Sequence, residues 1–243
     1  SVVSALGMSP IPGATVTISY TGDPDSPIET LTTDESGQTP EINLKAPPRE
    51  LSLTPDITEQ PYSEYNIQVT AEGFETVLVS GSEILAGAYS LQPIRMNPLD
   101  VTEEEEKVVV IPPHTLFGEY PPKIPEEEIK PMNETGEIVL SRVVIPEYVI
   151  VHDGDPEDPT ARNYWVRYKD YIKNVASSEI YPTWSESAIY ANILVIQSFT
   201  LNRVYTEWYR GKGYDFTITS STAYDQKWIY GRNVFEEIDY LVD

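Results

Sequence analysis

Glu179 is the residue whose type and position most favour chemistry. The apolar residues of segment 168–178 recur at helical spacing, and Glu179 continues their stripe seven residues after Ile172. Its carboxyl is therefore directed toward the core near the negative end of a helix, with Tyr181 and Trp184 following. Both effects disfavour the charged form and predict a raised pKa, as a general acid needs. The ordinary alternative for a lone glutamate at a helix end is a solvent-facing side chain.

Few other residues are suited to catalysis or metal binding. The chain has no cysteine and two histidines, which excludes disulfides, thiol nucleophiles and cysteine-based zinc sites. His114 follows two prolines and is interpreted as a surface-loop residue. His152 lies beside Asp153 and Asp155, where a weak cation site is conceivable, but a polar loop over 153–159 is the simpler interpretation.

The negative charge is concentrated in the first two thirds of the chain. The 243 residues carry a net charge of −23, of which segments 1–106, 107–160 and 161–243 contribute −15, −7 and −1. This acidity opposes phosphate backbones and argues against nucleic-acid binding. The acidic run 103–106 is interpreted as a solvated turn or strand edge, because adjacent side chains diverge. No apolar run approaches the roughly 20 residues of a membrane-spanning helix.

Composition divides the chain into three parts. Twenty of the 21 prolines precede residue 161, whereas all four tryptophans and 11 of the 17 tyrosines follow it. We therefore expect a domain over 1–100, a connector over 101–160 and a second domain over 161–243. The chain begins at Ser1 without a signal-like stretch, which indicates a fragment or a processed form.

The first domain has the pattern of a β-structure. Alternating apolar and polar residues predict strands over 14–20 and 65–71, and a weaker one over 91–96. Turn-forming residues separate these segments and no amphipathic helix competes, so we expect a small antiparallel β-sandwich. The proline-rich connector is expected to contribute short strands over 108–111, 143–145 and 148–151.

The second domain has the pattern of an α+β fold. A helix is expected over 168–178, and Pro182 prevents its continuation. The capping box Thr183-Trp-Ser-Glu186 starts a longer helix over about 184–209. Apolar residues cover almost its whole circumference, which predicts a buried central helix. Alternation predicts a strand over 214–220, followed by a polar loop.

Core packing is the expected role of most of the tryptophans. We expect it for Trp165, Trp208 and Trp228, whereas Trp184 is the exception because it flanks Glu179. The arginines of the long helix, Arg203 and Arg210, are expected to be ion-paired or to snorkel rather than to bind substrate.

The N-terminal motifs resemble the carboxypeptidase regulatory-like, or transthyretin-like, β-sandwich. The resemblance rests on Pro10-Ile-Pro-Gly-Ala-Thr-Val-Thr-Ile18, Thr33-Asp-Glu-Ser-Gly37 and Tyr65-Asn-Ile-Gln-Val-Thr-Ala-Glu-Gly-Phe74. It covers about 90 residues. Such modules are adhesive, spacing or structural parts of surface proteins, so the resemblance implies a noncatalytic role for this domain.

The C-terminal motifs resemble the stage II sporulation protein D family of peptidoglycan lytic transglycosylases and amidase enhancers. Asp170-Tyr-Ile-Lys-Asn-Val-Ala-Ser-Ser-Glu-Ile-Tyr-Pro-Thr-Trp184, followed by Ser187-Ala-Ile-Tyr-Ala-Asn192, is similar to the family's glutamate–turn–tryptophan–helix unit. Tyr214-Asp-Phe216, Gln226 and Tyr230-Gly231 are similar to its later core motif. The resemblance covers about 164–243 and implies that Glu179 is the catalytic acid.

This resemblance implies cleavage of glycan strands by a single carboxyl group. The acid protonates the glycosidic oxygen, and its carboxylate then removes the proton of the muramic C6 hydroxyl, which replaces water as the nucleophile. The expected substrate contacts are Tyr181, Trp184, Ser220, Ser221, Thr222, Tyr224 and Gln226. No cofactor is implied. The expected partners are peptidoglycan and other cell-envelope or particle proteins, and the expected location is extracellular or at the cell envelope.

The sequence departs from the family pattern in ways that keep an alternative open. Ile180-Tyr181-Pro182 stands where Met-Pro is usual, and the cysteines and histidines that bind zinc in some members have no counterparts. The family domain also normally continues past position 243. The alternative is therefore a noncatalytic structural or binding protein of the cell envelope or a phage-tail-like particle, with a degenerate domain. A sandwich that only oligomerises would leave the helical region unexplained.

Overall fold

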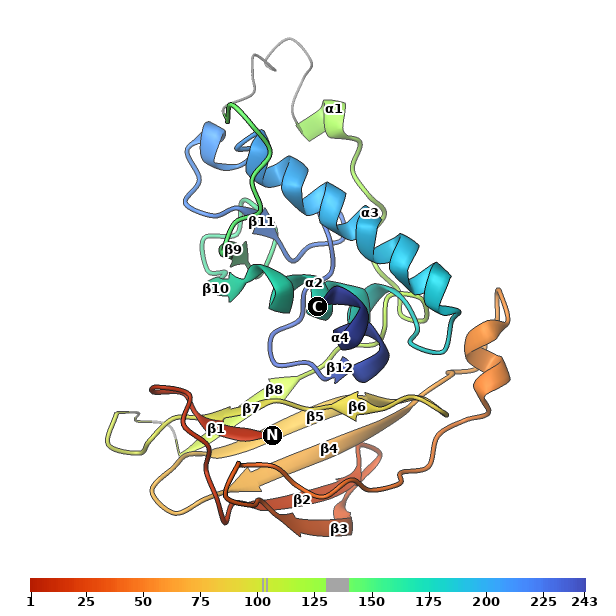
Figure 1. Ribbon diagram of the computed structural model, residues 1–243, viewed down its shortest axis with the longest axis vertical. Helices are drawn as coiled ribbons and strands as arrows, with labels where there is room; N and C mark the ends of the chain where they lie inside the picture. Colours follow the sequence, from red (N-terminus) through yellow and green to blue (C-terminus); the bar gives the residue numbers. More distant parts are fainter. Residues whose placement is uncertain (102, 104, 130–139) are drawn as a thin grey trace. The chain divides into compact units, whose positions relative to one another are not determined.

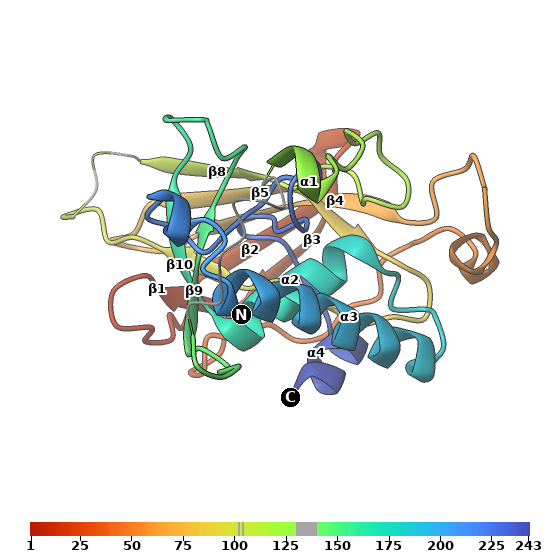
Figure 2. The same cartoon turned by 90° about the horizontal axis from the view of Figure 1, so that it is seen from above.

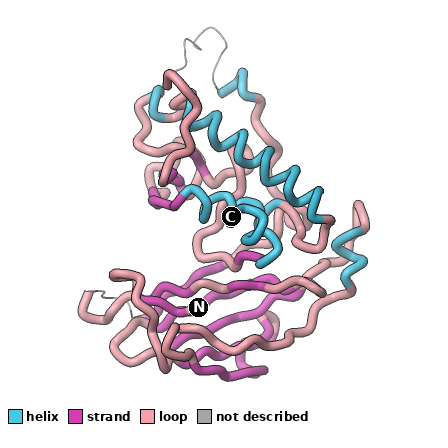
Figure 3. Tube along the Cα trace, in the orientation of Figure 1, coloured by secondary structure: helices cyan, strands magenta, loops and turns pink. Residues whose placement is uncertain are grey.

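The chain is divided into two compact units in a computed structural model that describes residues 1–101, 103, 105–129 and 140–243 (Figure 1). The first unit comprises Ser1–Pro113 with Tyr230–Glu237, and the second comprises His114–Ile229 with Ile238–Asp243. The predicted connector is thus shared between the units. Figure 3 shows that the strands dominate the first unit and the helices dominate the second.

A five-stranded sheet forms most of the first unit, in the order β3-β2-β4-β5-β8. The pairs β3–β2, β2–β4 and β4–β5 are antiparallel, whereas β5 and β8 are parallel. Two smaller pairs accompany the sheet: β1 with β7, parallel, and β6 with β12, antiparallel. The elements of this unit are β1 (Val2–Ser4), β2 (Thr15–Tyr20), β3 (Asp23–Thr32), η1 (Arg49–Leu53), β4 (Ser63–Thr70), β5 (Thr76–Ile84), β6 (Ser90–Leu91), β7 (Ile94–Met96), β8 (Glu106–Val110) and β12 (Val234–Phe235).

The strands predicted over 14–20 and 65–71 are present, but the main sheet is not wholly antiparallel. The segment 91–96 contributes to two short strands, β6 and β7, which pair with β12 and β1. Val16 and Ile18 on β2 are buried opposite Val69 and Ile67 on β4, which places the apolar positions of the alternation on one face. The chain passes through β6 and β7 before β8 returns to the sheet, so β8 runs in the same direction as β5. The unit is a β-rich structure with a mixed main sheet.

Gly37 occupies a turn in which a side chain would not fit. Its φ is +71°, and a Cβ atom built on it would lie 2.3 Å from the carbonyl oxygen of Val2. Asp34 Oδ1 closes the same turn by accepting the backbone N–H groups of Ser36 and Gln38 at 2.8 and 2.9 Å. The turn is therefore fixed around a residue that must lack a side chain.

Gly37→Ala is expected to lower the free energy of unfolding by about 2–4 kcal/mol, because it combines left-handed backbone strain with a clash against backbone. Urea unfolding followed by far-ultraviolet circular dichroism measures the change. Gly22→Ala is the matched control in the same unit, since nothing lies within 4 Å of a Cβ atom at Gly22. Equal stability of the two variants would contradict the prediction.

The segment Tyr230–Glu237 is held in the first unit by buried polar contacts. Arg232 Nη2 lies 3.0 Å from Glu83 Oε2 on β5. The Asn233 amide donates to the Glu83 carbonyl at 2.9 Å and accepts the Glu83 N–H at 3.2 Å. Burial raises the pKa of Glu83 to about 7, although the Arg232 charge opposes the rise. This late segment is therefore an integral part of the first unit.

The second unit has a three-stranded sheet and two packed helices. The strand order is β10-β9-β11, with β9 and β10 antiparallel and β9 and β11 parallel. α2 and α3 are in contact and lie side by side in both views (Figure 1, Figure 2). The elements are α1 (Glu126–Ile129), β9 (Tyr148–His152), β10 (Asn163–Arg167), α2 (Tyr168–Glu179), α3 (Glu186–Tyr205), η3 (Arg210–Lys212), β11 (Ile218–Thr219) and α4 (Glu236–Val242), whose first two residues belong to the first unit.

The structure confirms the helix predicted over 168–178 and corrects two strands. Residues 143–145 form no strand, and only Ile218–Thr219 of the segment 214–220 does. The Tyr214 ring instead packs against Tyr209 and Phe216, with ring centroids 6.0 and 5.0 Å away. Aromatic packing therefore takes the place of strand pairing in the first half of that segment.

The prediction that α3 is buried all round is wrong. Tyr190, Leu194 and Val195 are exposed by 50%, 45% and 67%, and they follow one side of the helix. The opposite side buries a single line of residues, Ile189, Ile193, Ile196, Thr200 and Arg203. The helix also begins later than expected, because the Ser185 hydroxyl caps it by accepting the Ala188 N–H.

Two of the three tryptophans expected in the core are there. Trp208 and Trp228 are 7% and 5% exposed, whereas Trp165 on β10 is 72% exposed. The prediction of core packing is therefore wrong for Trp165. β10 lies at the edge of its sheet and presents alternate side chains to solvent. In the described part of the chain, none of the helices combines the length and apolarity of a membrane span.

Candidate functional site

Glu179 is the last residue of α2, and its side chain is half-buried. The next residue, Ile180, adopts an extended conformation, and its N–H makes the final helical hydrogen bond to the Ala176 carbonyl at 3.0 Å. A short turn follows, closed by the Trp184 N–H and the Tyr181 carbonyl at 3.3 Å. Glu179 is therefore followed, within five residues, by the two aromatic residues of the turn, Tyr181 and Trp184.

A backbone donor from a distant segment holds the Glu179 carboxyl. The Lys227 N–H donates to Glu179 Oε1 at 2.7 Å. Burial raises the pKa of Glu179 to about 7, and the Lys227 N–H and the Lys123 charge oppose the rise. The carboxyl is therefore partly protonated near neutral pH, which suits a group that must both give and take a proton.

Two lysines with lowered pKa values accompany the carboxyl. Desolvation lowers the pKa of Lys123, and its Nζ donates to the Asp225 carbonyl at 3.2 Å and lies 4.3 Å from the Phe199 ring centroid. Burial also lowers the pKa of Lys227, whose Nζ lies over the Tyr120 ring at 5.6 Å. The Lys123 charge thus acts on the Glu179 carboxyl, whereas Lys227 contacts that carboxyl through its backbone N–H.

His114 is a buried residue that contacts the aromatic turn. It is 0% exposed, and its ring lies 4.5 Å from that of Tyr181, centroid to centroid. Nδ1 accepts the Leu116 N–H at 3.2 Å, so Nε2 carries the proton and donates to the Ile180 carbonyl at 3.3 Å. The prediction of a surface-loop histidine is wrong, because this ring is buried and both its nitrogens contact the backbone.

The predicted substrate residues around this turn differ in exposure. Tyr181 is 6% exposed, whereas Trp184 is half-buried and meets the Tyr181 ring edge-on at 6.2 Å. Trp184 is therefore the member of the pair with surface available to a ligand. The Tyr181 ring contacts both the Trp184 ring and the His114 ring, so aromatic packing holds this turn.

The remaining predicted residues lie in the loop after β11. The Ser220 hydroxyl donates to Asp153 Oδ1 at 2.8 Å, and the Thr222 hydroxyl is buried without a hydrogen-bond partner in the described parts of the chain. Ser221 and Tyr224 are half-buried. The buried Gln226 amide accepts the Tyr171 and Thr200 hydroxyls at 3.2 and 2.9 Å. The Gln226 contacts lie inside the unit, one residue before the backbone N–H that binds Glu179.

Asp225 is a buried centre that sequence reasoning missed. Its carboxylate accepts Arg203 Nε at 2.7 Å, the Tyr209 hydroxyl at 2.6 Å, and both the N–H and hydroxyl of Thr219, at 2.9 and 2.7 Å. Arg203 is therefore ion-paired, as predicted, although inside the core. No spacing in the sequence marks Asp225, because its partners come from α3, from the turn after it and from β11.

At the described positions considered from the sequence, the structure shows no cation site. His152 is 7% exposed, its Nδ1 meets Asn163 Oδ1 at 2.7 Å, and its Nε2 meets the Asp155 carbonyl at 3.1 Å. Among the residues that the structure describes, no group of three or more histidines and carboxylates is arranged to hold a metal ion. Of the acidic run 103–106, residue 104 lies outside the described residues, and Glu106 begins β8.

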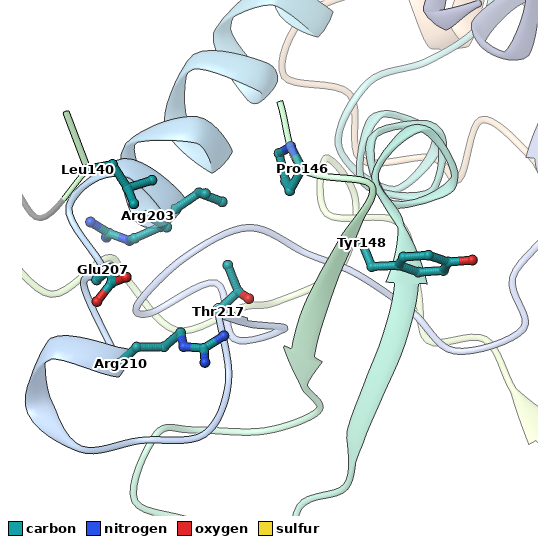
Figure 4. Close-up of a pocket in the computed structure, with 8 residues that line it drawn as sticks. Leu140, Pro146, Tyr148, Arg203, Glu207, Arg210 and Thr217 are labelled. Carbon is teal, nitrogen blue, oxygen red and sulfur yellow. The ribbon is translucent and has the colours of Figure 1, made fainter. Parts of the chain in front are cut away.

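A pocket of about 160 Å³ lies elsewhere in the second unit (Figure 4). Its lining comprises Leu140, Pro146, Tyr148, Arg203, Val204, Glu207, Arg210 and Thr217. None of the predicted site residues lines it, and Figure 4 shows the Tyr148 hydroxyl pointing away from it. The Arg203 charge there is already met by Asp225 and by Glu126 at 3.2 Å. The pocket is therefore separate from the residues predicted to act with Glu179.

Comparison of the sequence with protein-family models and with curated proteins found no match.

Proposed function

We propose that the second unit cleaves peptidoglycan glycan strands as a lytic transglycosylase similar to the stage II sporulation protein D family, with Glu179 as its acid and base. The observation that carries the proposal is half-buried Glu179, whose pKa is raised to about 7 and which directly precedes the aromatic turn with Tyr181 and Trp184. Such a group holds a proton at neutral pH and still ionises readily, as both steps of this reaction require.

The hydrogen bond from Lys227 assigns separate roles to the two carboxyl oxygens. Oε1 accepts the Lys227 N–H, so Oε2 is the oxygen suited to carrying the proton. Oε2 gives that proton to the glycosidic oxygen as the bond from this oxygen to the muramoyl C1 breaks. The resulting carboxylate removes the proton of the C6 hydroxyl, whose oxygen bonds to C1. The product is a 1,6-anhydromuramoyl end, and the acid is regenerated without consuming water.

The surface next to Glu179 offers suitable contacts for a sugar chain. Trp184 supplies an aromatic face, and Ser221 and Tyr224 are half-buried residues of the neighbouring loop. Tyr181 and Gln226 act by supporting these groups, because their side chains are packed inside the unit. Aromatic and hydroxyl-bearing side chains are of the kinds that bind saccharides, and the proposal assigns Trp184, Ser221 and Tyr224 to contacts with the sugar chain.

The first unit is proposed to serve attachment or spacing, as a transthyretin-like sandwich of the carboxypeptidase regulatory-like class. The mixed sheet β3-β2-β4-β5-β8 and its apolar face support this assignment. Residues 1–106 carry a net charge of −15, which favours a hydrated surface for this unit. The proposal places the chain outside the cell or in the cell envelope, where peptidoglycan and other envelope proteins are its partners.

The test is digestion of amidase-stripped glycan strands by the full chain, with products identified by mass spectrometry. Wild type is expected to release 1,6-anhydromuramoyl ends, and Glu179→Gln to lower the rate by about 10²–10⁴-fold, because glutamine cannot carry the proton. Glu147→Gln, which changes an exposed glutamate of the same unit, is the matched control and should keep wild-type activity. Absence of anhydro products from wild type, or equal rates for Glu179→Gln and Glu147→Gln, refutes the proposal.

A noncatalytic wall-binding protein is the second candidate. The observation favouring it is that the Gln226 and Ser220 side chains, two of the predicted substrate contacts, are engaged within the unit. On this alternative, the protein co-sediments with purified sacculi and releases no product. Glu179→Gln then leaves co-sedimentation unchanged.

A further inference from the structure

We propose that Asn174 is a positioning residue for Glu179: it fixes the backbone of residues 227–229 against α2, so that the Lys227 N–H keeps the carboxyl aligned. This inference rests on the proposed function for its catalytic meaning. Its structural part, the control of the Glu179 carboxyl by Asn174, can be tested separately.

The Asn174 side chain forms hydrogen bonds to the loop of residues 227–229 through both of its polar atoms. Nδ2 donates to the Ile229 carbonyl at 2.8 Å, and Oδ1 accepts the Ile229 N–H at 2.9 Å. Asn174 is 9% exposed, so water competes little for these two bonds. The amide thus pairs with both backbone groups of one residue, as a neighbouring strand would.

Asn174 and Glu179 both belong to α2. Asn174 lies five residues before Glu179 on α2, and Ile229 lies two residues after Lys227. Trp228, between them in the loop, is 5% exposed and packs against the Tyr164 ring at 5.4 Å. Residues 227 and 229 are therefore attached to α2 at two points, and a movement of the helix carries the donor with the acid.

The direction of the Lys227 N–H is set by the backbone conformation of its loop, so the loop must be held on both sides of Lys227. On the preceding side of Lys227, Gln226 is fixed by Thr200 and by the Ile196 carbonyl, at 2.9 and 3.2 Å. On the following side, Asn174 provides the two hydrogen bonds to Ile229. Without Asn174, the loop loses its attachment to α2 on that side, and the Lys227 N–H is no longer directed at Oε1.

Loss of the Lys227 hydrogen bond changes both the pKa and the orientation of the Glu179 carboxyl. The Lys227 bond favours the ionised form, so its removal raises the pKa of Glu179 further. Among the described residues, the other groups whose fields reach this carboxyl are the Lys123 ammonium and the Tyr171 phenol, whereas the Asn174 amide bonds to Ile229. With Oε1 released, the carboxyl can rotate and Oε2 is no longer held toward a substrate oxygen.

The experiment measures the Glu179 pKa in the full chain by carbon-13 NMR of the glutamate carboxyls, with the Glu179 signal assigned by its disappearance in Glu179→Gln. Asn174→Ala is expected to raise this pKa by about one unit, the scale of one lost hydrogen bond to a carboxylate. Asn163→Ala is the matched control, because Asn163 also makes two side-chain hydrogen bonds in the second unit, to His152 and Asp215. It should leave the Glu179 pKa unchanged.

Activity on glycan strands provides the second measurement. Asn174→Ala is expected to lower kcat about 10–100-fold with KM changed less than about twofold, because alignment acts on the transition state. The acidic-to-basic midpoint of its pH profile should move upward with the NMR pKa. Asn163→Ala should keep both kcat and the midpoint.

Asn174→Gln keeps the amide but lengthens the side chain by one methylene, and it is a milder variant should Asn174→Ala fail to fold. It should change the pKa and kcat in the same direction and by less. The inference is overturned if neither Asn174 variant moves the Glu179 pKa more than Asn163→Ala does. If wild type proves inactive while the pKa still shifts, the proposed function fails and the positioning of Glu179 by Asn174 stands.

Discussion

Asp225→Ala is expected to lower the free energy of unfolding of the second unit by about 3–5 kcal/mol, because it leaves the Arg203 guanidinium buried without its main partner. Arg203 and Asp225 have side chains with 0% exposure and lie 2.7 Å apart. The variant also removes the acceptor of the Tyr209 hydroxyl and of both Thr219 donors. Glu126, which is half-exposed, remains 3.2 Å from Arg203 and can restore only part of the lost interaction.

Tryptophan fluorescence during urea unfolding measures this effect in the full chain. All four tryptophans lie in residues 114–229, so the signal reports on the second unit alone. Asp215→Ala is the matched control, since Asp215 is exposed and accepts one hydrogen bond from Asn163 at 2.9 Å. It should change stability by less than about 0.5 kcal/mol.

A double variant separates the effect of the charge from that of lost packing. Arg203→Met combined with Asp225→Ala removes both charges, and the methionine can pack between the Phe199 and Trp208 rings, which lie 4.5 and 4.2 Å from the guanidinium. It should recover about 1 kcal/mol or more relative to Asp225→Ala. If the double variant is less stable than Asp225→Ala, the unpaired charge is not the cause of the loss.

Glu179→Gln is expected to stabilise the second unit above pH 7 by about 1–3 kcal/mol relative to wild type. The folded pKa of Glu179 is about 7, above the usual value of a glutamate in an unfolded chain, so the folded state binds this proton more tightly than the unfolded state. The wild-type contribution is therefore most favourable below about pH 4.5, declines as the pH rises to about 7, and is constant above it. Glutamine has no charge to bury, and its stability lacks this decline.

The measurement is the difference in unfolding free energy between Glu179→Gln and wild type, followed by tryptophan fluorescence from pH 4 to 8. The difference should increase between about pH 4.5 and 7 and then level off. Fluorescence is needed because Glu83, in the first unit, also has a pKa raised to about 7 and affects signals from the whole chain. Glu147→Gln should show no such rise, and a flat difference for Glu179→Gln contradicts the prediction.

The sequence could predict the elements whose side chains repeat regularly. The alternation in β2 and β4 and the apolar stripe of α2 each depend on neighbours within one segment, and the structure has all three. The position of Glu179 at the end of α2 followed from the same stripe. α3 was misjudged because apolar residues such as Leu194 and Val195 remain exposed, which periodicity does not reveal.

The environment of the carboxyl could not be predicted, because it is assembled from distant segments. The Lys227 N–H is a backbone group, which any residue except proline would supply, so no residue type signals it. The two prolines before His114 indicate a surface loop, whereas its burial depends on contacts with residues 180 and 181. Asn174 reads as an ordinary helical residue until Ile229 is placed beside it.

The return of Tyr230–Glu237 to the first unit means that no single cut in the backbone separates the two units as independent pieces. A fragment ending at Pro113 keeps the Glu83 carboxyl but lacks Arg232 and β12, the partner of β6. The complementary fragment carries Phe235, 0% exposed in the intact chain, without β6, the strand that pairs with β12. Each fragment should therefore be poorly soluble alone, and the two should be recovered only when they are produced together and reassemble.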